Sequence, residues 1–298
     1  MWLVAALAGF IVATVVNVLD KFVLDKTIKN PAVFVFYSTI VALLFFLAVP
    51  YVGGLDGASD YAAALLSGVC FVAGLWTSYV AIQKSEISHI GPLIGAVIPV
   101  FTFIWGRIFF AEQFSPVQIY AIVLLVLGSL VISFEKSAKH NGYHSGIAWG
   151  VVAGFVLSIF SVSAKYLYGH NDFAAGFVWS QAAIGAVTVL FLFSPAVRKS
   201  FKRAATPDEK MTGGKIALVA GDKFLGFIAL LLVQYAVSLG SVTLIYALAG
   251  VQYVLLIIAV ALLSKFYSQF YREEYSRGEL MQEFFAVALI VAGIYLLV

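Results

Sequence analysis

Apolar residues occur along this chain in long, nearly uninterrupted blocks. Each block is close to the roughly 20 residues that an α-helix needs to cross the hydrocarbon core of a bilayer, and none alternates as a membrane β-strand would. Residues that end helices or turn the chain separate the blocks, among them Pro31, Gly53, Pro116 and Pro195. The pattern therefore predicts an all-α membrane protein with ten transmembrane helices, at residues 2–19, 31–52, 61–83, 88–110, 116–134, 146–168, 174–194, 215–238, 242–264 and 280–298.

The composition excludes a soluble fold. Hydrophobic residues make up 62% of the 298 positions and charged residues only 11%, whereas an average soluble protein carries about 25% charged residues. The first apolar block has no basic segment before it and no small-residue cleavage site after it, so we expect a permanent span rather than a signal peptide. The single cysteine, Cys70, excludes an internal disulfide and a thiolate metal cluster.

The lysines and arginines are unevenly distributed among the connections between blocks. Fifteen of the eighteen lie in or beside the odd-numbered connections, and the other three are Arg107, Lys165 and Lys223. The positive-inside rule then places the odd connections in the cytosol and both termini outside, in a multi-pass protein of the inner or plasma membrane. The same rule explains the net charge of +3, so we expect no nucleic-acid partner.

The two halves of the chain resemble each other on either side of a linker at residues 135–145. With an offset of 144 residues, Asn17 and Lys21 align with Ser161 and Lys165, a polar residue followed four positions later by a lysine. Each half holds five predicted spans, an odd number, so the second half must enter the membrane from the opposite side. The prediction is a five-helix repeat at 1–134 and an inverted repeat at 146–298 around a central cavity. Chance similarity between apolar segments is the alternative.

The end of the first half carries a family resemblance. The run SEISHIGPLIGAVIPVFTFIWGRIFFAEQFSPVQIYAIVLLVLGSLVIS, with Pro92 and Pro99, the acidic residue of FFAEQFSP and a later glycine at Gly128, resembles the EamA-type carriers of the drug/metabolite transporter superfamily. This resemblance covers essentially the whole chain. It implies alternating access by two inverted five-helix halves around a central cavity, and it implies cytosolic termini, which conflicts with the charge distribution.

The second half departs from the family pattern. The stretch LLSKFYSQFYREEYSRGELMQEFF inserts extra residues between the ninth and tenth predicted spans, and it leaves the acidic position ambiguous among Glu273, Glu274 and Glu279. The segment from Ser264 to Gln282 mixes charged and aromatic residues, which is typical of an amphipathic helix on the headgroups or of a solvated helix.

Polar groups within the spans are the main candidates for function, because a central Arg, Lys or Asp costs about 2.5 to 3.5 kcal/mol on insertion scales. Lys21 and Lys165 lie near helix ends, where a lysine can extend its ammonium to the interface. Alternatively, Asn17 with Lys21 and Ser161 with Lys165 offer two cationic, hydrogen-bonding stations to the carboxylate or phosphate of a substrate.

Asp222 and Lys223 lie deeper, roughly 12 Å along the eighth predicted span at 1.5 Å per residue. Adjacent helical residues point about 100° apart, so we expect that these two do not face the same partner. Asp222 is the candidate for a proton-coupling group, since no other carboxylate is predicted at a comparable depth. A structural pair near a late-starting span is the alternative.

Helix-weakening residues and deep aromatic side chains suggest where a substrate binds. Pro92, Gly95 and Pro99 in the fourth span and Gly250 in the ninth predict a pair of kinked helices at the midplane, with close packing as the alternative. Further candidates for an amphipathic cavity wall, again with packing as the alternative, are Trp76, Tyr79, Trp179, Gln181, Tyr246, Gln252 and Tyr253.

No catalytic constellation occurs in the sequence, so an enzyme is not expected, and neither is a cofactor. His140 and His144 have the spacing of a helical metal-binding pair, but Asn141 and Gly142 between them predict a turn, so no metal is expected.

These observations predict a secondary-active transporter, an exporter, for small polar metabolites such as amino acids. It would act in a lipid bilayer as a monomer or homodimer, with protons as the coupling ion. One alternative is a carrier or antiporter of organic anions or phosphorylated metabolites that uses Lys21, Lys165 and Lys223. The other is a non-transporting membrane sensor or scaffold with packed helices.

Overall fold

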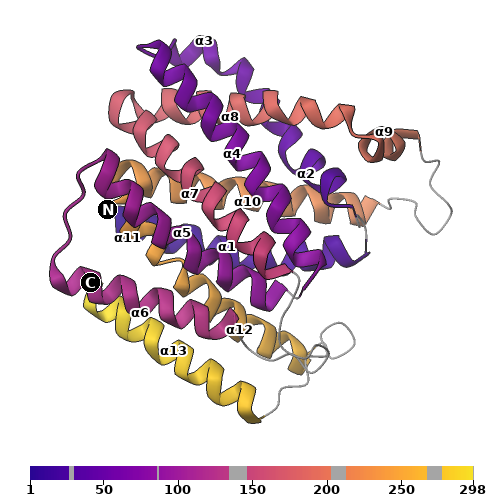
Figure 1. Cartoon of the computed structure of the whole chain (residues 1–298). Helices are drawn as coiled ribbons and strands as arrows, with labels where there is room; N and C mark the ends of the chain where they lie inside the picture. Colours follow the sequence, from indigo (N-terminus) through magenta and orange to yellow (C-terminus); the bar gives the residue numbers. More distant parts are fainter. Residues whose placement is uncertain (27–29, 86, 134–145, 203–212, 267–276, 298) are drawn as a thin grey trace.

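In the computed structural model, residues 1–26, 30–85, 87–133, 146–202, 213–266 and 277–297 are described. Every regular element within these ranges is a helix (Figure 1). In chain order they are α1 (Trp2–Lys26), α2 (Pro31–Thr39), the 3-10 helix η1 (Ile40–Leu47), α3 (Val49–Val52), α4 (Ala58–Gln83), α5 (Ile87–Phe109), α6 (Pro116–Ser133), α7 (Gly146–His170), α8 (Phe173–Val189), the 3-10 helix η2 (Leu190–Phe193), α9 (Pro195–Lys202), α10 (Gly213–Leu239), α11 (Val242–Ala247), α12 (Gly250–Phe266) and α13 (Arg277–Leu297).

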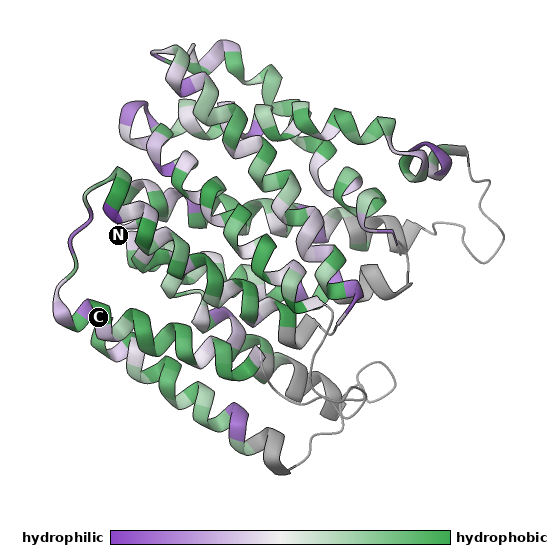
Figure 2. Cartoon of the chain, viewed as in Figure 1, coloured by the Kyte–Doolittle hydropathy of each residue, from purple (hydrophilic) through white to green (hydrophobic). Residues whose placement is uncertain are grey.

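The helices have the length and apolar character of a multi-pass membrane protein. Within the described residues, seven are long and apolar enough to cross a bilayer: Trp2–Asp20, Ala58–Gln83, Ile90–Phe109, Pro116–Ser133, Gly146–His170, Phe173–Phe193 and Ala220–Leu239. Three shorter apolar helices occupy Pro31–Leu47, Val242–Leu256 and Met281–Leu297. Apolar residues cover most of the helical surface, and many of the hydrophilic ones lie near helix ends or in α9 (Figure 2). The predicted all-α membrane fold is confirmed.

The long helices lie side by side, with their ends at two opposite faces of the molecule (Figure 1). Helix α1 runs antiparallel to α10, because Trp2 packs against Gly240 and Gly9 packs against Val233. Both marked chain ends lie at the face where α10 ends, which we call the terminal face (Figure 1). We call the other face, where α1 ends and α2 begins, the loop face.

Helices α4 and α7 form a second antiparallel pair, with Gly74 against Leu157 and Gly146 against Ala81. The ammonium of Lys165 near the end of α7 lies 2.8 Å from the carbonyl oxygen of Gly240, so α7 ends at the terminal face, where α1 begins. The first helices of the two predicted halves therefore run in opposite directions.

Close backbone approaches join several helices. A Cβ built on Gly68 of α4 would lie 2.7 Å from the backbone of Ala183 in α8, and one on Gly185 of α8 would lie 2.5 Å from the backbone nitrogen of Leu43 in η1. Small residues that let helix backbones touch are a common means of association in membranes, where lipid is as apolar as a leucine side chain. These contacts join η1, α4 and α8 into one closely packed group.

The fourth and ninth predicted spans differ in form. Helix α5 continues through Pro92 and Pro99 as a single helix. The ninth block is broken between Ala247 and Gly250, although it contains no proline. The break is made of three-residue turns, in which Ala249 donates to the carbonyl oxygen of Tyr246 and Val251 to that of Leu248, so the backbone groups stay bonded. The helix assignment is therefore interrupted in the ninth block and continuous in α5, and the predicted kinks at Pro92, Gly95 and Pro99 stay a prediction.

Candidate functional site

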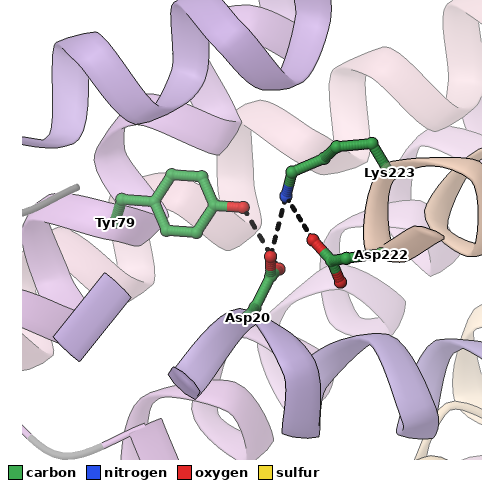
Figure 3. Close-up of polar contacts among 4 residues, drawn as sticks. All are labelled: Asp20, Tyr79, Asp222 and Lys223. Atoms are coloured by element: carbon green, nitrogen blue, oxygen red, sulfur yellow. Dashed lines mark hydrogen bonds and ion pairs between the residues drawn. The ribbon is translucent and has the colours of Figure 1, made fainter. Parts of the chain in front are cut away.

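Four side chains from three helices form a polar cluster inside the bundle, toward the loop face (Figure 3). The Lys223 ammonium lies 2.8 Å from Oδ1 of Asp20 and 2.8 Å from Oδ2 of Asp222. The Tyr79 hydroxyl donates to Oδ2 of Asp20 at 3.4 Å. We call Asp20, Tyr79, Asp222 and Lys223 the Asp–Lys cluster. The antiparallel register that sets Gly9 against Val233 also brings Asp20 of α1 beside the two α10 residues.

The cluster is buried and carries an uneven number of charges. The Asp222 side chain is 0% exposed, while those of Asp20 and Lys223 are 13% and 21% exposed. Both Asp222 oxygens are buried and accept no hydrogen bond from the described residues, although Oδ2 is in ion-pair contact with Lys223. Two carboxylates and one ammonium sum to one negative charge. Burying an ion costs several kcal/mol unless it is paired and hydrogen-bonded.

Aromatic rings line the other side of the cluster. The Lys223 ammonium lies 4.3 Å from the centroid of the Phe34 ring of α2, a cation–π geometry. Phe34 in turn packs edge-on against Tyr79, with ring centroids 4.5 Å apart. The ammonium is therefore held between two carboxylates and one aromatic face.

Two sequence expectations about this region are corrected. Asp222 and Lys223 were expected to face different partners, but Lys223 contacts both Asp222 and Asp20 because its four-carbon side chain can bend back along the helix. Asp20 was missed, since the first span was predicted to end at residue 19. Helix α1 extends to Lys26, which places Asp20 within the helix rather than after it.

Lys165 caps the end of α10. Its ammonium donates to the backbone carbonyl oxygens of Val237 at 2.9 Å, Ser238 at 3.4 Å and Gly240 at 2.8 Å. An ammonium has three donors, and the carbonyl end of a helix carries a partial negative charge. Lys165 is thus hydrogen-bonded within the protein. This arrangement differs from both sequence interpretations, in which its ammonium extends to the membrane interface or binds a substrate anion.

A carboxylate lies at the start of α11, just as the Lys165 ammonium lies at the end of α10. Glu112, the acidic residue of FFAEQFSP, accepts a hydrogen bond from the backbone nitrogen of Val242 at 3.1 Å and from the Thr243 hydroxyl at 2.8 Å. The amide end of a helix carries a partial positive charge. The turn between α10 and α11 is therefore held by a lysine on one side and a glutamate on the other.

A hydrogen-bond chain joins α7, α10 and α11 toward the terminal face. The Tyr168 hydroxyl donates to Oε1 of Gln234 at 3.1 Å, and Nε2 of Gln234 donates to the Tyr246 hydroxyl at 3.3 Å. Gln234 is 1% exposed but is not among the candidates predicted from the sequence. The depth of a polar residue within a predicted span therefore did not identify every buried polar residue. Ser161, which was a candidate, donates to the carbonyl oxygen of Leu157 in its own helix.

The other aromatic and amide candidates are not brought together in one wall. Trp76 is 38% exposed and packs edge-on against Trp149. Trp179 donates its indole N–H to the carbonyl oxygen of Gly53, near the start of α8. Gln181 of α8 is buried.

The remaining candidates lie along α1, α5 and α12. The ring of Tyr253 fills the space beside Gly91 and Gly95, so Gly95 makes room for close packing of α5 on α12. Gly250 lies against Ile290 and Ser129. Asn17 is half-buried in α1, and Gln252 is half-buried in α12. The side chain of Lys21, the residues His140 and His144, and the acidic positions 273 and 274 lie outside the described residues.

Within the described ranges, no group of three or more His, Cys, Asp or Glu side chains is arranged to hold a metal ion.

Comparison with known proteins finds a family match in the first part of the chain. Residues 1–134 match the model of the EamA-like transporter family. This family belongs to the drug/metabolite transporter superfamily, as predicted from the residues. Members of the EamA family are transporters rather than enzymes. Residues 1–134 are thus similar to a family of membrane transporters, and the apolar helices in the described residues are those of a multi-pass membrane protein.

A solved structure extends the likeness to the whole chain. It is titled "Crystal structure of protein" and aligns with a TM-score of 0.63 and 19% sequence identity, over 98% of this chain and 97% of that one. At this identity the match shows a shared fold. A search of curated proteins gives no sequence match.

Proposed function

We propose that this protein is a secondary-active transporter that exports small polar metabolites, such as amino acids, by alternating access of two inverted five-helix repeats. The observation that carries the proposal is the opposite direction of α1 and α7, the first helices of the two halves. Trp2 at the start of α1 and Lys165 near the end of α7 both contact Gly240. An inverted repeat requires this arrangement.

Helix pairing supports the same proposal. In a five-helix repeat, the first span corresponds to the sixth and the third span to the eighth. If the first and eighth spans pack on each other, the symmetry therefore requires that the sixth and third spans do so too. The structure has both, since α1 packs along α10 and α7 packs along α4. The fifth and tenth spans, α6 and α13, pack on each other, as do η1 and α8 of the second and seventh spans. These are the contacts expected across a pseudo-twofold axis.

The polar groups favour a cargo without excess negative charge. The two lysines described inside the bundle are already bonded, Lys165 to three carbonyl oxygens and Lys223 to two carboxylates. Neither ammonium is free to bind a phosphate or an organic anion in this conformation. Most other buried polar side chains are hydroxyls and amides, such as those of Ser180, Gln181 and Gln234. Hydroxyls and amides suit zwitterionic or neutral solutes.

The charge distribution supports an orientation. The helices on either side of the odd-numbered connections have their ends at the loop face (Figure 1), and these connections hold most of the lysines and arginines of the sequence. We propose that this face is cytosolic and that both termini lie outside the cell membrane.

Binding and transport of solute panels test the proposal. Purified protein is screened by thermal shift with common amino acids, organic anions and phosphorylated sugars, since a ligand that binds only the folded state must stabilise it. Solutes that raise the melting temperature are then tested, radiolabelled, for uptake into proteoliposomes. We expect stabilisation and uptake with amino acids. Stabilisation by anions alone would favour the anion carrier, and a ligand without uptake, or no response at all, would favour a sensor or scaffold.

A further inference from the structure

We propose that Asp20, Asp222 and Lys223 form one proton-binding site, and that a proton there releases α1 and α10 from α2 and α4 at the loop face. This inference rests on the proposed transport function, to which it adds the coupling ion and the place where the ion acts. It starts from the charge of the Asp–Lys cluster. Two carboxylates and one ammonium leave one negative charge among largely buried groups.

One proton balances this charge. A proton taken from water forms an O–H bond with one carboxylate oxygen and brings the sum of charges from minus one to zero. Oδ2 of Asp222 contacts the Lys223 ammonium, whereas Oδ1 accepts no hydrogen bond within the described part of the chain, so its lone pairs are available to a proton. The same ammonium lies 2.8 Å from an oxygen of each carboxylate, so a proton on either one changes the charge that both share. The site is therefore the pair rather than either residue alone.

A metal cation fits this site less well than a proton. Hard cations such as Ca²⁺ take about six to eight oxygen ligands, and Mg²⁺ demands an octahedral shell. The Lys223 ammonium already lies 2.8 Å from an oxygen of each carboxylate, in the position between them. A second cation would meet this positive charge at short range, whereas a proton needs a single lone pair.

The cluster links two groups of helices. Asp20 and Lys223 belong to α1 and α10, which pack closely at Gly9. Tyr79 and Phe34 belong to α4 and α2, which pack against each other and against α8. The two groups also meet where rings of α10 pack on rings of α8, Tyr235 on Phe173 and Phe227 on Phe177, while none of the described glycines mediates a close approach between them. At the loop face the cluster spans them by the Tyr79–Asp20 hydrogen bond and the Lys223–Phe34 contact.

Both spanning contacts depend on charge. A hydrogen bond to an ionised carboxylate is roughly twice as strong as one to a neutral acceptor. A proton on the carboxylate pair therefore weakens the bond from Tyr79. The proton also weakens the attraction between the two carboxylates and the Lys223 ammonium. This attraction positions the ammonium over the Phe34 ring. Among the described residues, the titratable groups at the site are the four members of the Asp–Lys cluster, of which Tyr79 comes from α4, while α2 presents Phe34.

Distance measurements between spin labels test the inference without any substrate. In a Cys70→Ala background, labels are placed at Lys84→Cys, the C-cap of α4, and Ala220→Cys, an exposed position on α10. In reconstituted wild-type background we expect the label distance to increase at acidic pH. Asp20→Asn and Asp222→Asn each leave one carboxylate and one ammonium, so we expect the pH dependence to be lost in both. Asp20→Glu should restore it.

Asp60→Asn is the matched control. Asp60 is a buried carboxylate at the other end of α4, where it accepts a hydrogen bond from Asn171 at 3.0 Å. This variant should keep the pH dependence. The inference is wrong if the distance changes equally in both Asn variants of the cluster and in the wild type, or if Asp60→Asn also loses the response.

Infrared difference spectroscopy on the wild-type protein needs no variant that must fold. Acidification should produce the band of a buried protonated carboxyl group, and its absence would overturn the inference. Because neither measurement contains substrate, a negative result leaves the uptake assay intact. Conversely, a pH-dependent distance without uptake of any solute would contradict the proposed function while leaving the proton site in place.

Discussion

Lys165 and Glu112 show how single charges are accommodated in this apolar bundle. Each meets a helix end of opposite partial charge, the ammonium at the last carbonyls of α10 and the carboxylate at the first amide of α11. Hydrogen bonds to charged groups contribute more than neutral ones, about 1.5 to 3 kcal/mol each. The structure therefore assigns these residues a part in holding the α10–α11 turn.

Lys165→Met tests this assignment, because methionine keeps much of the apolar stem and removes the three donors. We expect the free energy of unfolding to fall by about 2 kcal/mol, since the carbonyls at the end of α10 lose a charged partner. Thermal denaturation in detergent measures the change. Lys199→Met, at an exposed position in α9, is the control and should unfold like the wild type. Unchanged stability with lost binding of anionic solutes would instead support a substrate station.

The sequence predicts only some of the residues that form these contacts. The cost of burial singles out Asp222, Lys223 and Lys165 in the sequence, because charges are rare in apolar blocks. It could not supply their partners, which come from other helices. Asp20 directly follows the first apolar block, predicted at 2–19, and the extension of α1 to Lys26 places it within the helix.

At the scale of helices, glycines set the closest contacts. Gly185 of α8 touches the backbone of Ala42 and Leu43 in η1, and Gly128 of α6 faces Ile290 of α13. Because lipid offers no hydrophobic gain for helix association, such contacts contribute through dispersion and close packing. They join elements from different halves of the chain, which hydropathy alone did not predict.

Gly185→Ala tests the packing of α8 on η1. A Cβ there would lie 2.5 Å from the backbone nitrogen of Leu43, so the two helices must separate. Overpacking of this kind costs about 1 to 3 kcal/mol, and we expect a lower melting temperature. Gly169→Ala, where a Cβ would meet nothing within 4 Å, is the matched control and should not destabilise. Equal melting temperatures for the two variants would show that the approach is not tight.

The apolar blocks predicted where helices occur better than where they bend. Block length and turn residues follow from bilayer thickness and backbone chemistry, and so they could be recognised in the sequence. The break of the ninth block at Leu248 and Ala249 could not be placed in the same way, since no proline occurs in that block. Shortly after the break, the ring of Tyr253 in α12 packs into the space beside Gly95 of α5, which is a contact between the two halves.

At the scale of the whole molecule, the two ends of the bundle are joined in different ways. The terminal face has Lys165 on the carbonyls of α10, and the loop face has the Asp–Lys cluster. At the terminal face the contact joins α7 to α10, and at the loop face the cluster joins α1 to α4 and α10 to α2. A transporter that opens alternately to the two sides needs one such contact to release while the other holds.

Counterflow in proteoliposomes tests the carrier mechanism most directly. Vesicles that contain the protein are loaded with an unlabelled mixture of common amino acids and diluted into a trace of the same mixture, radiolabelled. A carrier that alternates between two sides predicts transient accumulation of label inside, above the level in unloaded vesicles and absent from protein-free ones. Label that only equilibrates at the same rate with or without internal amino acids, or that never enters, would contradict transport of these solutes by alternating access.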